Sequence, residues 1–160
     1  MKLRWKDSGD VFIVLLAALV FVCGGNGARA QTISEITPLN FGTIVIISFS
    51  AVGSVTLNPS GGYTYNSNVY LIDPPQLGEY QLSGGPPNAL YTLSFPSSVP
   101  MNGGGGPFTL DNLEARPLTL MTDGAGEDTF TVSGRIQTLG GGTHYNDGAY
   151  NGVVTITMNF

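Results

Sequence analysis

Few side chains in this sequence have the type and spacing that chemistry requires, and His144 is the first to consider. It stands two positions after three consecutive glycines and three positions before Asp147. A histidine beside a carboxylate can act as the base for a serine or threonine nucleophile. Neither a G-x-S-x-G nor an S-x-x-K element accompanies it. We therefore expect His144 to lie in a solvated loop, and we predict a protein that is not an enzyme and has no catalytic residues.

Three carboxylates, from Asp123, Glu127 and Asp128, lie in one short glycine-rich segment. Calcium takes oxygen ligands from loops of this kind. The spacing differs, however, from the calcium loop in which acidic residues alternate and a glutamate completes the ligand set. We expect an ordinary hairpin turn, assign no metal and no cofactor, and leave calcium binding by residues 123–128 as an open alternative.

Neighbouring carboxylates also suggest a glycosidase, in which two acids flank the bond that is cleaved. The pairs are Asp111 with Glu114 and Glu127 with Asp128. An acidic domain contains such pairs by composition alone, and residues 31–160 contain no tryptophan that could stack against a sugar. We interpret these four side chains as solvated surface groups.

The first thirty residues show, in order, the three zones of a secretory signal peptide. Basic residues at positions 2 to 6 precede an apolar run over residues 11–23, and the run is followed by the cleavage pattern Ala28-Arg29-Ala30. The run is shorter than the roughly 20 apolar residues that span a bilayer, and the bulky residues before Cys23 disfavour a lipoprotein site. We predict that residues 1–30 are a cleaved signal peptide and that the protein is secreted, from the periplasm to the cell surface.

The composition of residues 31–160 restricts the partners of the protein. They contain no cysteine and no lysine, and their arginines are Arg116 and Arg135. Because carboxylates outnumber these cations, nucleic acid and anionic lipid surfaces are poor partners. The segment is long enough for a single domain that buries about two-thirds of its surface. Without cysteine, its stability must come from the packing of sheets rather than from disulfides.

Short runs rich in Val, Ile, Thr, Tyr and Phe alternate along residues 31–160 with clusters of Gly, Pro, Asn and Ser. This pattern is typical of an antiparallel sandwich or barrel, and no stretch has a helical period. Loops are expected at residues 58–62, 101–107 and 140–142. The predicted strands cover residues 39–47, 53–57, 69–72, 79–83, 90–95, 108–113, 118–121, 129–137 and 150–160.

The segment from Ala149 to Phe160 is the most informative of the predicted strands. Its side chains alternate with a period of two. The simplest interpretation is a core strand with one solvated face. A strand that ends the chain can also pair with a strand from another protein, as in pilins. The candidate assembly residues on its apolar face are Tyr150, Val154, Ile156, Met158 and Phe160.

Outer-membrane barrels also end in an alternating strand, but they require longer strands and aromatic girdles. Most of the predicted strands are too short, and the ten prolines interrupt them. We therefore expect no membrane insertion. The alternatives to an assembly subunit are a monomeric secreted module, which binds an ion or a glycan through the loops around Asp123 and His144, and then a small barrel.

Five strand-and-turn elements follow one another in a recognisable order. They are Leu39 to Ile44, Gly53 to Pro59 with Gly61-Gly62, Tyr91 to Pro96, Thr129 to Gly134, and Gly148 to Phe160. Together they cover most of residues 31–160. Their order resembles a bacterial family of secreted domains of unknown function linked to Mat/Ecp-type fimbrial major subunits, and more distantly the pilin-like spore coat protein U group.

The resemblance implies an immunoglobulin-like antiparallel β-sandwich of the pilin type, and a structural subunit of a fimbria-like or cell-surface assembly. Self-assembly and a periplasmic chaperone are the implied partners. The absence of lysine from residues 31–160 disfavours sortase linkage, and Gln31 begins no long apolar helix of the type IV kind. Strand complementation remains as the expected route. Its candidate N-terminal arm is Ile33, Ile36, Leu39 and Phe41, although the first two are three positions apart.

Overall fold

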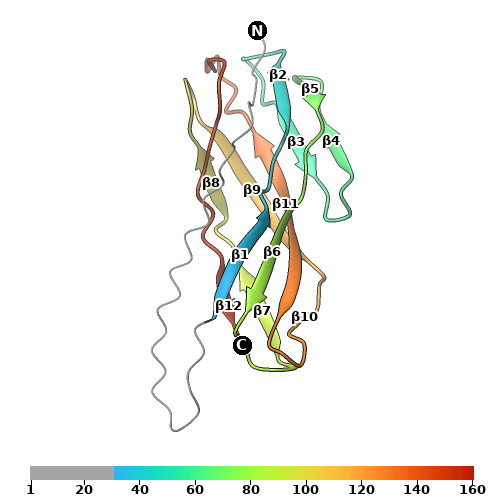
Figure 1. Ribbon diagram of the computed structural model, residues 1–160. Helices are drawn as coiled ribbons and strands as arrows, with labels where there is room; N and C mark the ends of the chain where they lie inside the picture. Colours follow the sequence, from blue (N-terminus) through green and yellow to red (C-terminus); the bar gives the residue numbers. More distant parts are fainter. Residues whose placement is uncertain (1–30) are drawn as a thin grey trace.

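The computed structural model describes residues 31–160, and all of their regular secondary structure is β (Figure 1). The predicted signal peptide, residues 1–30, lies outside the described residues. Every pairing between strands is antiparallel, which confirms the predicted all-β antiparallel class. The strands are β1 (Thr32–Thr37), β2 (Thr43–Ile46), β3 (Ser54–Leu57), β4 (Tyr63–Tyr65), β5 (Val69–Asp73), β6 (Gly78–Ser83), β7 (Leu90–Ser94), β8 (Ser98–Met101), β9 (Phe108–Arg116), β10 (Leu120–Met121), β11 (Asp128–Gln137) and β12 (Thr157–Asn159).

Seven strands form one sheet, and β11 is its centre. The first half of β11 pairs with β6 and the second half with β3, so β6 and β3 lie end to end along one edge. Strand β9 pairs along the other edge. Farther out, β1 pairs with β6, β4 with β3, and β8 with β9. The remaining strands form a β10-β7-β12 sheet and a β2-β5 pair.

The side-chain pattern of β11 explains its central place. Phe130, Val132 and Ile136 alternate along the strand and are buried in the core. Apolar β-branched and aromatic residues with this period favour a strand that has one face on the core. Gly134 continues the same face, and a Cβ atom there would lie 3.1 Å from Cδ2 of Leu113. The glycine therefore lets β9 and β11 pack closely at this point.

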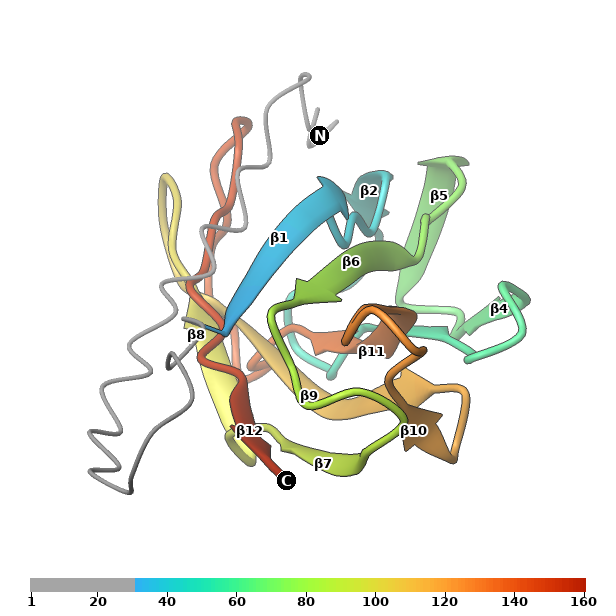
Figure 2. The same cartoon turned by 60° about the horizontal axis from the view of Figure 1, so that its bottom comes forward.

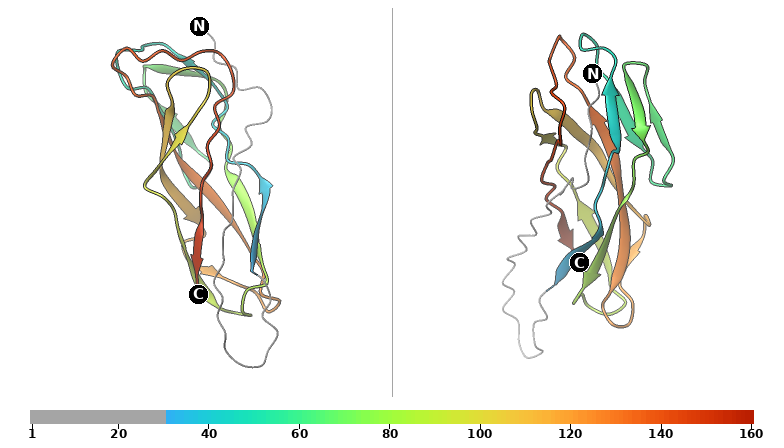
Figure 3. Two further views of the ribbon diagram at one scale, coloured as in Figure 1. Left: turned by 90° about the vertical axis from the view of Figure 1, so that its left-hand side faces the viewer. Right: turned by 45° about the horizontal axis from the view of Figure 1, so that its top comes forward.

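The large sheet curls into a half-barrel, which Figure 2 shows from one end. Its strands follow one another as β1, β6, β11, β9 and β8. A bridge between Asn102 and Asn151, with N to O distances of 2.8 and 2.9 Å, adds the C-terminal segment beyond β8. Strand β1 and the C-terminal segment are therefore the two borders of the curled sheet, and Figure 3 (left) shows both on the same side of the molecule.

Two buried tyrosines fix the glycine-rich loops to the core. The rings of Tyr145 and Tyr150 lie 4.7 and 4.8 Å from the ring of Phe108, measured between centroids. The hydroxyl of Tyr150 donates to the carbonyl oxygen of Gly104 at 2.7 Å and lies 3.1 Å from that of Asn146. The loop that contains residues 102–107 and the loop before the C-terminal segment are thus held by the same side chain.

The predicted strands are largely present, with three instructive differences. Strands β1, β4 and β8 have no counterpart among the strands predicted from the sequence pattern. The strand predicted at 39–47 begins only at Thr43, because Gly42, with φ of 72°, turns the chain closely against the carbonyl of Asp73. The strand predicted at 150–160 forms a ladder only at Thr157–Asn159.

Candidate functional site

The C-terminal segment combines a buried face with backbone groups that have no partner strand. Tyr150, Val154 and Ile156 are buried, Met158 is half-buried, and the residues between them are exposed. The segment is thus extended and alternates as expected. Only β12 pairs with another strand, β7. Within residues 31–160, no backbone hydrogen bond involves the N–H or C=O groups of residues 152–156.

Phe160 completes the predicted apolar face but is 45% exposed. Its ring lies 5.6 Å from the ring of Tyr91, and a Cβ atom at Gly85 would come within 2.8 Å of it. The buried part of the predicted face therefore ends before the final aromatic residue, which packs against the loop between β6 and β7.

Prolines in the neighbouring segment explain the missing ladder. Strand β7 pairs with β12, and Asn102, which follows β8, pairs with Asn151, so residues 95–101 run alongside residues 152–156. This stretch contains Pro96 and Pro100, which have no N–H group to donate. The carbonyl oxygen of Pro100 would lie 3.0 Å from a Cβ atom at Gly152. The two segments are close together without forming a regular sheet.

The free backbone groups of this segment point away from β8. Successive residues of a strand direct their N–H and C=O groups to alternate edges. Asn151 directs both groups to Asn102, on the β8 side. Residues 152, 154 and 156 therefore direct theirs to the opposite edge, at the open border. Gly152 is buried, and so are the side chains of Val154 and Ile156, which fixes the direction of these backbone groups.

Strand β1 forms the other border of the curled sheet and pairs with β6. Ile33 lies opposite a buried leucine of β6 and is half-buried. Glu35 and Thr37 lie opposite consecutive residues of β6, so Ile36 is the extra residue of a β-bulge and is 53% exposed. The bulge accounts for the three-residue spacing of the two isoleucines.

A charged side chain on β1 faces the same side of the sheet as the core. Glu35 lies opposite the buried Tyr80. Burial raises the pKa of the Tyr80 phenol above its ordinary value, and the charge of Glu35 raises it further. A charged residue that points inward from an edge strand discourages unselective pairing along that edge. Glu35 therefore places one charged side chain on the core-facing side of this border strand.

The predicted N-terminal arm divides into two parts. Ile33 and Ile36 belong to β1, whereas Leu39 and Phe41 are core residues with 3% and 1% of their surface exposed. The backbone bridge between Asn40 and Gln76 fixes the chain between them. Of the four residues, Ile33 packs against the edge of the core, Ile36 is exposed, and Leu39 and Phe41 belong to the core itself.

The acidic segment at 123–128 is a closed turn. One carboxylate oxygen of Asp123 accepts hydrogen bonds from the N–H groups of Glu127 (2.9 Å) and Ala125 (2.8 Å), and these bonds lower the pKa of Asp123. Asp128 accepts a hydrogen bond from the hydroxyl of Tyr91 at 2.8 Å. In the part of the chain that the structure describes, no group of three or more His, Cys, Asp or Glu side chains is arranged to hold a metal ion.

His144 lies where two loops meet. Its ring is 5.2 Å from the ring of Phe49, between centroids. The N–H groups of Gly141 and Gly142 donate to the carbonyls of Ser50 (3.1 Å) and Phe49 (2.8 Å). The three glycines, all with positive φ, let the loop follow this path. The surroundings of His144 thus fasten one loop to another.

Asp111 and Arg135 form a bidentate pair between β9 and β11. Nε and Nη2 of Arg135 donate to the two carboxylate oxygens at 2.8 and 2.9 Å, and the side-chain amide of Gln137 adds a third bond at 2.7 Å. Hydrogen bonding to Arg135 lowers the pKa of Asp111, with a smaller contribution from Gln137. The carboxylate of Asp111, which the sequence suggests is a solvated group, therefore accepts three hydrogen bonds.

This pair predicts a loss of stability in acid. Because the pKa of Asp111 is lower in the folded protein than the ordinary value of 3.8, the stabilisation is complete above that value and is lost as the pH falls through the folded pKa. The contribution is up to about 1 kcal/mol, since the pair lies at the sheet surface. Thermal unfolding between neutral and acidic pH should show a smaller pH effect in Asp111→Ala than in the wild type. Glu114→Ala, on the same strand and face, is the matched control and should follow the wild type.

Residues 31–160 contain no helix with the length and hydropathy to cross a lipid bilayer. A family model described as a domain of unknown function, DUF4402, matches residues 32–160. No curated protein and no solved structure shows a significant match. The comparisons thus provide a family, and no named relative links this chain to fimbrial subunits.

Proposed function

Since the chain belongs to the DUF4402 family of domains of unknown function, whose description names no activity, we propose a function from the open border of the curled sheet. The protein is a secreted structural subunit of a fimbria-like or cell-surface assembly. A second copy adds a strand beside the C-terminal segment at this border, and a periplasmic chaperone covers the border before assembly. The subunit is pilin-like in this respect.

The observation that carries the proposal is the row of backbone groups at residues 152, 154 and 156. An incoming strand can bond to the N–H and C=O groups of each. A net contribution of about 1 kcal/mol for each hydrogen bond gives several kcal/mol in total, which the cost of association reduces. The buried side chains of Val154 and Ile156 keep these groups aligned for pairing.

We propose residues 31–37 of a neighbouring copy as the added strand. In its own chain this segment pairs with β6 as the outermost strand. Of its two isoleucines, Ile33 is half-buried and Ile36 is exposed. Moving the segment from one copy to another therefore disturbs few core contacts, while Leu39 and Phe41 stay in place.

An immunoglobulin-like arrangement is the finer structural proposal. Its support comes from Tyr150, whose hydroxyl bonds to the carbonyl of Asn146, four residues earlier. The tyrosine corner of immunoglobulin-type sandwiches uses the same bond, from a tyrosine near the start of a strand to the backbone a few residues upstream. In this proposal the separate β10-β7-β12 sheet is the second layer of the sandwich.

Hydrogen exchange tests this function directly. In concentrated protein, the amides of residues 152, 154 and 156 should exchange at least about tenfold more slowly than in dilute monomer, because an added strand must open before they exchange. The amides of β11, which is paired on both edges, serve as the internal control and should be protected in both samples. A protein that stays monomeric at all concentrations, or oligomers in which residues 152–156 still exchange rapidly, would refute the proposal.

A further inference from the structure

Two asparagines that are each followed by glycine face each other where the C-terminal segment meets the end of β8. They are Asn102, before Gly103, and Asn151, before Gly152, and residues 31–160 contain no other Asn-Gly pair. The backbone bridge between Asn102 and Asn151 places the two pairs side by side. Figure 3 (left) shows the loop after β8 next to the C-terminal segment.

An asparagine before a glycine can lose its side-chain amide without an enzyme. The backbone nitrogen of the glycine, after losing its proton, attacks the Cγ atom of the asparagine, and a five-membered succinimide forms as ammonia leaves. Water then opens the ring at one of its two carbonyls and gives aspartate or isoaspartate, so the net reaction consumes one water and releases one ammonia. Glycine favours the attack because it has no Cβ atom to restrict the backbone. Asparagine is accordingly among the thermolabile residues.

The reacting groups at Asn102 are not engaged elsewhere in the fold. The side chain is exposed, and within residues 31–160 neither its amide nor the N–H of Gly103 takes part in a hydrogen bond. Gly103 is exposed as well. By contrast, the side chain of Asn66 forms hydrogen bonds with three backbone groups. Asn102 therefore has both its side chain and the attacking nitrogen available.

Asn151 has the same neighbour in the sequence but different surroundings. Gly152 is buried, and a Cβ atom there would lie 3.0 Å from the carbonyl oxygen of Pro100. The side chains of Tyr150 and Val154, before and after this pair, are buried in the core. The nitrogen of Gly152 can therefore turn toward the side chain of Asn151 only after the C-terminal segment opens locally, which slows the reaction.

We propose that Asn102 is a site of spontaneous deamidation in the folded protein, and that the fold protects Asn151. The reaction takes place within one copy, independently of the proposed assembly. In isoaspartate the main chain continues through Cβ and Cγ, so the backbone lengthens at the bridge that joins β8 to the C-terminal segment. A second conversion, at Asn151, would set two carboxylates opposite each other, which is unfavourable.

The hydroxyl of Tyr150 limits the rate at Asn102. It donates to the carbonyl of Gly104 at 2.7 Å, and the N–H of Asn146 donates to the same oxygen. Because the peptide group between Asn102 and Gly103 must rotate before the attack, bonds to the next residue restrain the reaction. Tyr150→Phe keeps the ring and releases one of these bonds, so it should raise the rate at Asn102 several-fold.

Peptide mapping by mass spectrometry measures both reactions in protein kept in warm, mildly alkaline buffer. Cleavage after Arg135 places Asn102 and Asn151 in different peptides. In the folded protein, Asn102 should convert at least about tenfold faster than Asn151, because only Asn151 requires local unfolding. In guanidinium chloride, which unfolds the chain, the two rates should become similar. Equal rates in the folded protein, or faster conversion of Asn151, would overturn the proposal.

Two controls separate this reaction from other changes. Asn112 is also exposed but precedes a leucine, and it should stay unconverted while Asn102 reacts. Asn102→Gln keeps an amide but would need a larger ring, so the conversion at this position should be lost. Conversion of Asn102 no faster than that of Asn112 would contradict the proposal, and an unchanged rate in Tyr150→Phe would contradict the restraint by its hydroxyl.

Discussion

Replacing Tyr150 with alanine is expected to lower the free energy of unfolding by about 3–5 kcal/mol. The side chain is fully buried, and its ring packs against Phe108 and Tyr145. Its hydroxyl donates to the carbonyl of Gly104. The substitution therefore leaves a cavity where the glycine-rich loop meets the C-terminal segment, and a carbonyl without its donor. Urea denaturation followed by circular dichroism measures the change.

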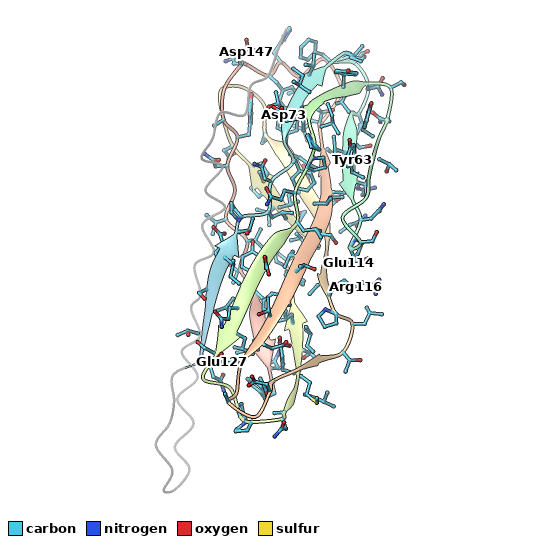
Figure 4. All side chains as sticks on the ribbon, turned by 45° about the vertical axis from the view of Figure 1, so that its right-hand side comes forward. Tyr63, Asp73, Glu114, Arg116, Glu127 and Asp147 are labelled. Atoms are coloured by element: carbon cyan, nitrogen blue, oxygen red, sulfur yellow. The ribbon has the colours of Figure 1, made fainter. Side chains whose placement is uncertain are left out.

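Two further variants separate the ring from the hydroxyl. Tyr150→Phe keeps the ring and removes the hydrogen bond, and is expected to cost about 1–2 kcal/mol. Tyr63→Ala changes a tyrosine at the surface of β4 (Figure 4) and should stay within about 0.5 kcal/mol of the wild type. A Tyr150→Ala protein that is as stable as Tyr63→Ala would show that the loops do not depend on this anchor.

Replacing Val154 with proline is expected to weaken self-association by at least about tenfold. The substitution removes an N–H group that points to the open border, and one lost hydrogen bond of about 1 kcal/mol, together with the steric conflict of the ring, accounts for this factor. Analytical ultracentrifugation over a range of concentrations measures the shift from oligomer to monomer.

Two control variants separate the lost N–H group of Val154→Pro from the change in its side chain. Val154→Thr keeps the N–H group and changes the buried side chain, so it reports the effect of altered packing. Val153→Pro removes an N–H group that points to the β8 side, where no hydrogen bond is found among the described residues. Both should retain association near the wild-type level, with circular dichroism confirming the fold. Association by Val154→Pro equal to that of Val153→Pro would mean that the open border is not the contact.

The sequence was sufficient to predict the long central strands. Strand β11 was predicted almost to its ends, because Phe130, Val132 and Ile136 alternate with polar residues and glycine-rich segments stand on both sides. The glycine loops predicted at 58–62 and 140–142 are confirmed, and Gly61 and Gly140 to Gly142 adopt the positive φ that glycine permits. The alternation of apolar and polar residues is enough to predict a strand when one face of that strand lies on the core.

Other features depend on contacts between distant segments. The bulge at Ile36 breaks the alternation of β1, so a strand was read as an irregular arm. Strand β8 contains Pro100 and is preceded by Pro96, and prolines argue against a strand in the sequence pattern. The strand forms nonetheless, because its ladder lies on the edge that faces β9. The incomplete ladder of residues 152–156 follows from the prolines of the neighbouring segment. The alternation of the C-terminal segment was visible in the sequence, but which edge of it is open was not.

The position of β11 between three strands has a mechanical consequence. Strands β6, β9 and β3 run along the same long axis as β11 (Figure 1), and each is bonded to it over several residues. A pull along that axis loads these bonds together in shear, so they must break at once rather than one after another. Resistance to force depends on the rate of unfolding rather than on equilibrium stability, and this geometry raises the barrier that sets that rate.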